Sequence, residues 1–397
     1  MLEIIHRKKR LSSFKLIALG FAGVIVLGAL ILMLPFSSNT GSVTPFHEAL
    51  FTSTSAVCVT GLVVQDTGSY WSAFGQAVIL LLIQIGGLGV VTVAATFAML
   101  PVFCRDHGFK GIWMAAFHSV SAFCNAGFDI LGTTENKYPS LTGYVGEPTI
   151  NIVIMILIIV GGIGFLTWDD ICTNRWHFKK YRMQSKVILV TSVILIIVPA
   201  IFFFLFDFTG LPPGEKILAS LFQSVTPRTA GFNTADLTAM TESSKAIMIL
   251  LMLVGGSPGS TAGGIKTTTL AVLILNAFSV CRKKNDTEVY GRRLECSAVK
   301  SASTIAVIYF LLFFIGGIII STAESMPLSA CLYETASAVG TVGLTLGVTP
   351  QLSVFSQFIL IVLMYLGRVG GLTLIYAAIS NKNQSGAKLP LEKITVG

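Results

Sequence analysis

Long stretches without a charged residue constrain this chain more than any other feature. They cover the ranges 16–35, 67–104, 148–168, 187–206, 301–323 and 351–367. Most of them reach the roughly 17–25 residues that a membrane-spanning helix needs. Only 12% of the 397 residues are charged, against about 25% in typical soluble domains. Since backbone polar groups in lipid must be bonded within the chain, the sequence predicts an all-α polytopic membrane protein.

The basic residues are distributed by side. They cluster at 7–10, 175–182 and 282–293, whereas the segments 36–66 and 322–352 contain no Lys or Arg. The positive-inside rule then predicts that the basic connectors of a plasma-membrane protein lie in the cytoplasm and that the segments without Lys or Arg face outward. Both termini are also expected in the cytoplasm if the topology is complete. The basic patches are short and juxtamembrane, which favours contact with membrane lipid over nucleic-acid binding. The seven cysteines are scattered and are expected to be packing residues.

Four short segments resemble one another, and a glycine ends each small-residue run. They occupy 51–62, 117–128, 222–232 and 333–344, and their glycines are Gly61, Gly127, Gly231 and Gly343. Hydroxyl residues precede each glycine, and glycine frees the backbone to turn its carbonyls inward. Ion selectivity filters are rings of backbone carbonyls, so the four segments are predicted to form the walls of one central pore.

A second motif of small residues follows each glycine segment, at 86–92, 161–167, 255–261 and 367–373. The repeat is therefore predicted to be an outer helix, a short re-entrant helix, the glycine loop and an inner helix. Prolines at 45, 212–213 and 327 indicate where three of the re-entrant helices start. The negative end of such a half-helix points at the pore and favours cations. The expected divisions are 1–100, 101–172, 173–285, and 286–397 with a cytoplasmic tail.

These motifs resemble the Trk/Ktr/HKT potassium transporter superfamily, and the chain looks most similar to the Ktr membrane subunit. The resemblance involves all four loops and most of residues 10–380. It implies potassium uptake across the plasma membrane by a homodimer with one pore per subunit. It also implies a cytosolic nucleotide-binding regulatory ring as partner, and Na⁺ as a coupling or activating ion. K⁺ is then the transported ion, with no organic cofactor and no metal site beyond it.

The resemblance also associates filter glycines with potassium, and serine at the first of them with sodium preference. The predicted filter residues are Val59, Thr60, Gly61, Asn125, Ala126, Gly127, Thr229, Ala230, Gly231, Thr341, Val342 and Gly343.

The segment 255–264 cannot continue a helix comfortably, because it holds five glycines and a proline. It is either an exposed turn or an intramembrane loop below the filter, and the resemblance makes it the gate. Its residues are Gly255, Gly256, Ser257, Pro258, Gly259, Ser260, Thr261, Ala262, Gly263 and Gly264.

Arg368 is the lone charge in the apolar stretch 353–380, where an arginine costs at least roughly 2.5–3.5 kcal/mol. It is expected to face the pore or a partner, with snorkelling to the interface as the alternative. The resemblance makes it a positive barrier facing the gate. Lys266, Asp169 and Asp170 are expected at cytoplasmic helix ends, and Glu48, Asp129 and Glu334 at the outer rim.

The second unit departs from the family pattern, because its outer helix is missing. Only about eleven residues separate Leu100 from Ile112, and as a helix they span roughly 16 Å. In one account about fifty residues are absent and the unit is incomplete, leaving seven crossings where the family has eight. In the other, the uncharged run 67–104 folds back at 86–89 into two short crossings.

Other functions remain as alternatives. One is a non-conducting, truncated isoform, and another is the ion-binding subunit of a potassium-pumping ATPase. A membrane enzyme is not expected, since the five histidines are scattered. No glycine loop followed by Lys-Ser/Thr is present to bind a nucleotide phosphate.

Overall fold

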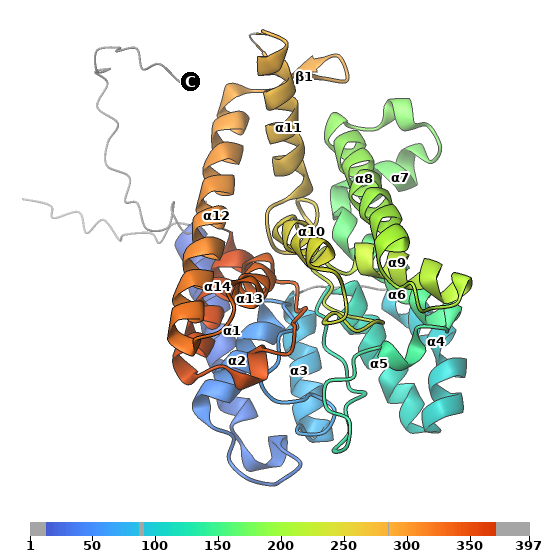
Figure 1. Ribbon diagram of the computed structural model, residues 1–397, viewed down its shortest axis with the longest axis vertical. Helices are drawn as coiled ribbons and strands as arrows, with labels where there is room; N and C mark the ends of the chain where they lie inside the picture. The colour runs from blue at the N-terminus through green and yellow to red at the C-terminus, as the bar shows by residue number, and fades with distance from the viewer. Residues whose placement is uncertain (1–12, 87–90, 285, 371–397) are drawn as a thin grey trace, which may run out of the picture.

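The structure, a computed structural model, describes residues 13–86, 91–284 and 286–370 (Figure 1). The helices are α1 (Ser13–Leu32), α2 (Phe46–Val57), α3 (Ala73–Gly86), α4 (Val91–His107), α5 (Lys110–Phe123), α6 (Pro148–Ile163), α7 (Phe165–Asn174), α8 (Met183–Phe206), α9 (Pro213–Val225), α10 (Glu242–Leu253), α11 (Thr267–Cys281), α12 (Cys296–Glu324), α13 (Leu328–Gly340) and α14 (Val354–Val369). Strands β1 (Glu288–Val289) and β2 (Arg292–Arg293) pair antiparallel in a short hairpin. The fold is thus mostly helical, as predicted.

Several of these helices are apolar enough to lie in a membrane. Within the described residues, α8 and α12 are long enough to cross one alone, with 24 and 29 residues. Helices α6 and α7 pass the same test together but are bent by 101° at Gly164. Shorter apolar helices occur in α1, α3, α11 and α14. These lengths fit a multi-pass membrane protein.

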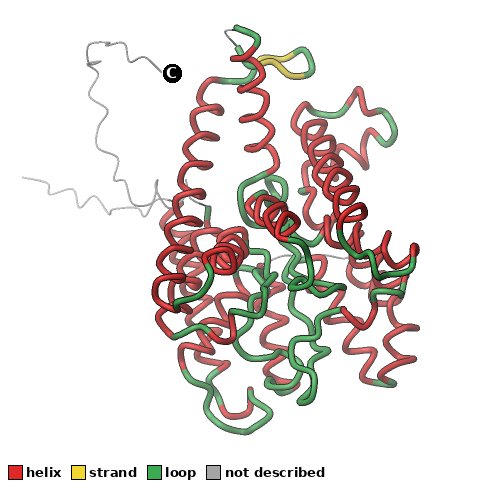
Figure 2. The backbone as a smooth tube through the Cα atoms, in the orientation of Figure 1, coloured by secondary structure: helices red, strands yellow, loops and turns green. Residues whose placement is uncertain are grey.

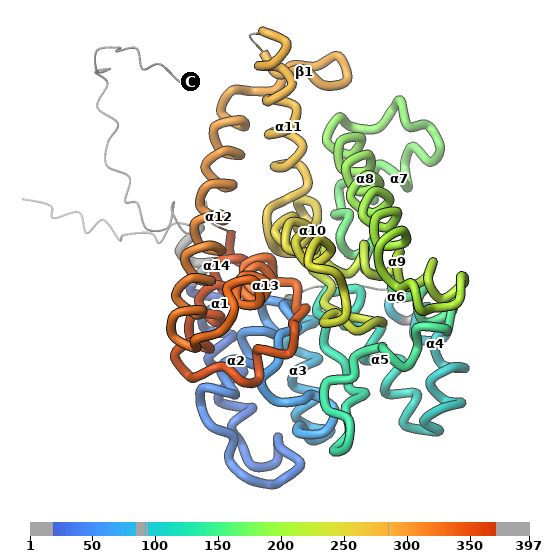
Figure 3. The backbone as a smooth tube through the Cα atoms, viewed as in Figure 1, coloured from blue at the N-terminus to red at the C-terminus, as the bar shows by residue number. Residues whose placement is uncertain are grey.

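Four pairs of consecutive helices pack against each other. Helices α1 and α2, α4 and α5, α8 and α9, and α12 and α13 lie against each other. In each pair a short helix precedes a loop and then α3, α6, α10 or α14. Figure 2 shows loop segments in the centre of the molecule with helices around them. Figure 3 shows that these central segments come from all parts of the chain, blue to red.

Three of the short helices start at the positions that the prolines in the sequence predicted. Pro45 and Pro327 are the N-caps of α2 and α13, and Pro213 is the first residue of α9. Proline suits these positions because its fixed φ fits the helix and its missing N–H is not needed there. Helix α5 starts without one, after Phe109.

The helices that follow the glycine loops end at the second small-residue motif. Helix α6 ends before Gly164 and α14 before Gly370, whose φ angles are 95° and 87°. Helix α10 ends just before the segment 255–264. Helix α3 ends at Gly86, and residues 87–90 of its motif lie outside the described residues. Left-handed φ angles favour glycine, so the motif breaks helices as well as allowing close packing.

The structure places a helix, α4, before α5, where the sequence predicted that the second unit lacks its outer helix. Helix α4 packs along α5 and α6, as α12 packs along α13 and α14. It crosses the boundary expected at residue 100. That boundary was expected because the uncharged run 67–104 reads as one inner helix. With 17 residues, α4 spans about 25 Å and is shorter than α8 and α12. The uncharged run 67–104 is divided between two short helices, α3 and α4, as the fold-back alternative predicted. However, α3 and α4 do not pack closely on each other.

Both described basic connectors lie at one end of the molecule. The α7–α8 connector and the hairpin β1–β2 are at the top in Figure 1, and the blue loop after α1 is at the bottom. This separation matches the sided distribution of charge in the sequence.

Candidate functional site

The four glycine loops share one backbone conformation. The residue two before each glycine has a left-handed φ, at 55° for Val59, 56° for Asn125, 71° for Thr229 and 53° for Thr341. The glycines themselves have φ angles of 84°, 71°, 83° and 96° in chain order. Left-handed φ is rare outside glycine, so its recurrence at one position of four separate loops indicates a common structure.

The four glycines form a closed ring. A Cβ atom added to Gly61 would lie less than 3.0 Å from the carbonyl oxygen of Ala126, in the next loop. A Cβ added to Gly127 would likewise lie less than 3.0 Å from the carbonyl oxygen of Ala230. In the same way, Gly231 lies against the carbonyl oxygen of Val342, and Gly343 against the carbonyl oxygen of Thr60. Each glycine therefore touches the carbonyl before the next glycine, and the fourth loop closes onto the first. We call Gly61, Gly127, Gly231 and Gly343 the glycine ring.

The amide groups of these loops are bonded back to the short helices. The N–H of Thr60 donates to Ser55 O at 2.8 Å, and that of Ala126 to Ser121 O at 2.8 Å. Val342 donates to Ser337 O at 2.8 Å, and Ala230 to Thr226 O at 3.0 Å. The loops are thereby fixed from behind by the helices that precede them.

The carbonyls of the same loops are left without donors. Among the described residues, no hydrogen bond reaches a carbonyl oxygen of the twelve predicted filter residues, although all twelve are buried. Buried backbone carbonyls are nearly always paired. Twelve unpaired oxygens around one ring therefore suit a ligand that needs only acceptors, such as a desolvated cation.

Side-chain oxygens add to this acceptor-rich region. Thr229 Oγ1, Thr341 Oγ1 and Asn125 Oδ1 are buried without a hydrogen-bond partner in the described part of the chain. All three belong to the residue two before a glycine, and in the first loop this residue is Val59. The ring is thus fourfold in backbone but not in side chains.

Residues 255–264, which we call the gate loop, are a mostly buried loop and not an exposed turn. The loop is closed at its base by bonds from Gly255 N to Ile265 O, at 2.8 Å, and from Ile265 N to Leu253 O, at 3.1 Å. Within this loop only Gly259, at its tip, is exposed.

The gate loop touches the filter loops. Asn125 Nδ2 donates to Thr261 Oγ1 at 3.1 Å. A Cβ at Gly263 would overlap the side chain of Thr341. The structure therefore brings the predicted gate and two of the predicted filter segments into direct contact.

Two basic side chains hold the gate loop by its carbonyls. Arg368 reaches it from α14 and donates to Thr261 O. Lys266 Nζ donates to Ala262 O at 2.6 Å and contacts Gly263 O at 3.5 Å. Lys266 was expected at a cytoplasmic helix end, and this contact was missed. Its position directly after the loop in the sequence was the available signal.

The gate loop also rests on the break between α6 and α7. Ser257 N donates to Gly162 O at 2.9 Å, and Thr261 N to Gly161 O at 3.2 Å. In the other direction, Phe165 N at the start of α7 donates to Gly259 O at 3.0 Å. The bend at Gly164 leaves these helix-end groups unpaired within the helix, and the gate loop satisfies them.

The acidic residues expected at the outer rim have different surroundings. Glu334 is completely buried in α13 and accepts bonds from Thr345 Oγ1 at 2.6 Å, Leu346 N at 3.0 Å and Thr349 Oγ1. It braces the fourth loop and is not part of a solvated rim. Glu48 accepts from Gln65 Nε2 at 3.0 Å. Burial, and then the Asp66 carboxylate, raise the pKa of Asp129 to about 7.

Asp169 and Asp170 lie in α7, close to the start of α8. Arg182 bonds Asp169 Oδ2 at 2.9 Å, and Asp170 is buried against the start of α8.

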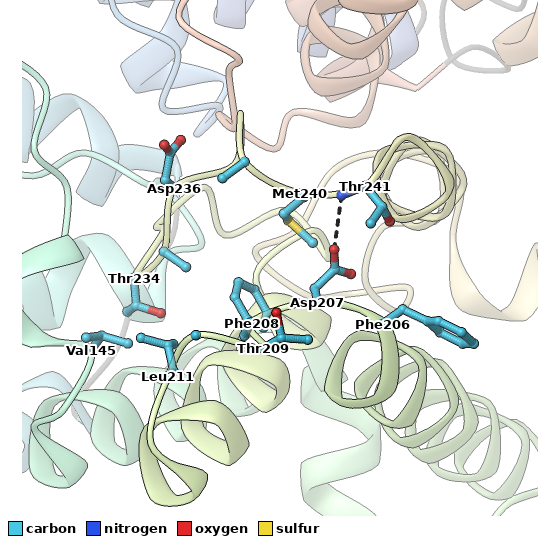
Figure 4. Close-up of a pocket in the computed structure, with 13 residues that line it drawn as sticks. Val145, Phe206, Asp207, Phe208, Thr209, Leu211, Thr234, Asp236, Met240 and Thr241 are labelled. Carbon is cyan, nitrogen blue, oxygen red and sulfur yellow. Dashed lines mark hydrogen bonds between the residues drawn. The ribbon is translucent and has the colours of Figure 1, made fainter.

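A separate cavity of about 430 Å³ lies where α8, α9 and α10 approach each other (Figure 4). There Asp207 accepts from Thr241 N at 3.0 Å and ties the end of α8 to the start of α10. None of the predicted site residues lines this cavity.

Apolar helices arranged around a ring of carbonyls without donors are typical of polytopic membrane transport proteins, and this chain is of that class. A family model described as TrkH, cation transport protein, matches residues 91–386. The chain belongs to this family.

Individual relatives agree with the family assignment. The chain is 36% identical to the potassium/sodium uptake protein NtpJ of Enterococcus hirae, with 98% of each chain covered. It is 34% identical to the Ktr system potassium uptake protein B of Bacillus subtilis, with 96% of each covered. The fold matches the crystal structure of the potassium transporter TrkH from Vibrio parahaemolyticus with a TM-score of 0.76 at 20% identity, covering 94% of this chain and 86% of that one.

The alignments also measure a shortfall in this chain. The alignment with NtpJ has 450 positions, to which 98% of 397 residues contributes about 389. About 60 positions therefore have no residue here, close to the fifty expected from the sequence. In the structure, α4 follows α3 after only the residues 87–90.

Proposed function

We propose that this protein takes up potassium across the plasma membrane through the glycine ring. The observation that carries this proposal is the set of twelve buried filter carbonyls without a donor. Such oxygens replace the water that a cation loses on entering a pore. The relatives named as potassium uptake proteins support K⁺ as the cargo. The name of NtpJ also includes sodium, which supports a role for Na⁺.

The pore is proposed to lie between four units of outer helix, short helix, loop and inner helix. Their outer helices are α1, α4, α8 and α12, and their inner helices start with α3, α6, α10 and α14. The second unit then starts with α4 and not at residue 101. The third and fourth units keep the expected divisions at 173–285 and 286–397.

The gate loop is proposed to block the path below the ring, held there by Arg368 and Lys266. The positive charge of Arg368 would repel a cation leaving the filter. Opening must break the bonds that these side chains make to Thr261, Ala262 and Gly263. By family resemblance, a cytosolic nucleotide-binding ring controls this step in a homodimer with cytoplasmic termini.

Growth and flux measurements test the proposal. Expression in a host that lacks potassium uptake should restore growth at low K⁺, and proteoliposomes of the purified protein should take up Rb⁺. Gly61→Ser should lower the ratio of K⁺ to Na⁺ uptake, because the added side chain enters the ring. If the protein is folded and inserted but supports neither growth nor flux, the proposal is contradicted.

The missing positions favour a second candidate, a non-conducting member of the family. The first unit has no counterpart of α7 or α11 between α3 and α4 in the described residues, so the inner half of the path has one wall fewer. In this case the protein binds partner subunits but passes no ions. Rb⁺ flux with wild-type protein separates the two candidates directly.

A further inference from the structure

The connector between α7 and α8 presents a basic and aromatic surface that no contact explains. It contains Trp176, whose exposed fraction is 97%, and the exposed cations Arg175, Lys179 and Lys180. No carboxylate of the described chain pairs with these three cations within 4.0 Å. We call residues 175–180 the basic connector.

The basic connector lies close to the membrane. Helix α8, which is long enough to span it, begins at Met183. Tryptophan is enriched at membrane–water interfaces, and juxtamembrane Lys and Arg are attracted to anionic lipid. The charge and the aromatic side chain together fit a surface of anionic phospholipid headgroups.

The basic connector is rigidly attached to α7. The buried carboxylate of Asp170 accepts bonds from Arg182 N at 3.1 Å and from Ser185 Oγ at 2.5 Å. The hydroxyl of Tyr181 donates to Arg175 O, and Lys186 Nζ donates to Lys179 O at 2.7 Å. These bonds fix the end of α7, the connector and the start of α8 to one another.

The other end of α7 holds the gate loop. Phe165 is its first residue, and its N–H donates to Gly259 O at the tip of that loop. The bend of 101° separates α7 from α6 at Gly164, and Trp168 Nε1 of α7 donates to Val160 O of α6 at 2.9 Å across it. A tilt of α7 about Gly164 has to break or stretch this bond. A continuous chain of bonded groups thus joins the lipid-facing connector to the gate loop.

We propose that anionic lipid binds the basic connector and, through α7, shifts the gate loop towards its open position. This inference rests on the proposed gate. Lipid can shift the gate only if it binds the two positions of α7 with different affinity. The connector supplies that difference, because tilting α7 moves its charges relative to the headgroups.

Flux from proteoliposomes tests the gating. Rb⁺ uptake by the full chain should rise about fivefold when phosphatidylglycerol is mixed into phosphatidylcholine, the lower end of typical allosteric coupling. The triple variant R175Q/K179Q/K180Q should lose this rise. The control K283Q/R292Q/K300Q removes three exposed charges from around the α11–α12 connector and should keep it. Equal loss in both variants would mean general surface attraction and would overturn the proposal.

A pair of substitutions at one position tests the transmission through α7. Phe165→Pro removes the N–H that bonds Gly259 O, at a helix position where proline is tolerated. Phe165→Ala removes the same side chain but keeps the N–H. The proline variant should lose the response to phosphatidylglycerol while the alanine variant keeps it. A response in both variants would overturn the role of α7.

Lipid contact has its own readout. Brominated phosphatidylglycerol should quench tryptophan fluorescence more than brominated phosphatidylcholine, and Trp176→Phe should abolish the difference. Equal quenching by both lipids would exclude the contact, and would leave a cytosolic protein as the occupant of the connector. If no vesicle supports Rb⁺ flux, the proposed function fails together with the gating step, while quenching still decides the contact.

Discussion

The filter loops and the gate loop are both glycine-rich and buried, but their backbone oxygens are used in opposite ways. None of the twelve filter carbonyls accepts a hydrogen bond in the described structure. In the gate loop, carbonyls of Gly256, Ser257, Gly259, Thr261, Ala262 and Gly263 all do. Glycine content alone therefore does not identify a conducting loop. The pairing of the carbonyls separates the proposed ion-binding loops from the proposed gate.

The largest expected effect comes from adding a side chain to a glycine of the glycine ring. Gly127→Ser should lower Rb⁺ uptake about 10- to 100-fold, because the new Cβ overlaps Ala230 O and such overpacking costs about 1–3 kcal/mol. Gly41→Ser is the matched control. Its φ of 67° is close to the 71° of Gly127, but nothing lies within 4 Å of its added Cβ. Equal losses in both variants would attribute the effect to backbone strain and not to the ring.

Releasing the gate loop should have the next largest effect. Arg368→Gln removes the charge that holds Thr261 O, and a hydrogen bond to a charged group is worth about 1.5–3 kcal/mol. Rb⁺ flux should rise about tenfold, without a change in the ratio of K⁺ to Na⁺ uptake. Unchanged or lower flux would show that the contact does not keep the path closed.

The contact between gate and filter is expected to matter less. Thr261→Val keeps the shape but removes the hydroxyl that accepts from Asn125 and lies 3.1 Å from Gly161 O. A loss of about 1 kcal/mol in the closed state should raise Rb⁺ flux about fivefold. Ser260→Ala is the control, because its hydroxyl bonds only within the gate loop. A larger rise with Ser260→Ala would contradict the coupling.

The smallest effect concerns pH at the outer loops. Because the pKa of Asp129 is raised to about 7, its carboxyl is neutral at pH 6 and charged at pH 8. The K⁺ concentration for half-maximal uptake should fall about twofold over this range at low salt. Asp129→Asn should abolish the change. Asp236→Asn should not, since bonds from Thr238 lower the pKa of Asp236 and keep it charged throughout.

The raised pKa of Asp129 also affects folding stability, which it lowers as pH rises. The raised pKa means that the folded protein binds a proton at Asp129 that the unfolded chain has released. Stability contributed by this group therefore falls as pH rises from about 3.8 towards 7. Asp129→Asn should remove this slope from thermal unfolding measured in detergent. A steeper slope in the variant would contradict the assignment.

Local patterns predicted much of this molecule. The glycine of each filter loop, the prolines before the short helices and the broken helix at 255–264 are visible in single segments of the sequence. Contacts between segments were not. The bonds of Lys266 and the support of the gate loop by Gly161 and Gly162 depend on how distant units pack, which no local period records.

The placement of α4 shows the same limit. Its residues follow α3 without a charge or a proline between them, so hydropathy reads both as one run. Only the contacts of α4 with α5 and α6 show that it packs against these two helices.

The closed glycine ring has a consequence for biosynthesis. Gly343 meets Thr60 O, and so the last contact joins residues from opposite ends of the chain. The ring cannot be completed until the fourth short helix has entered the membrane, although the first loop is made some 280 residues earlier. Until then the unpaired carbonyls of the first three loops must remain in water or against other chain segments, since lipid cannot satisfy them. Slow insertion of α13 should therefore expose the nascent protein to degradation more than slow insertion of α1.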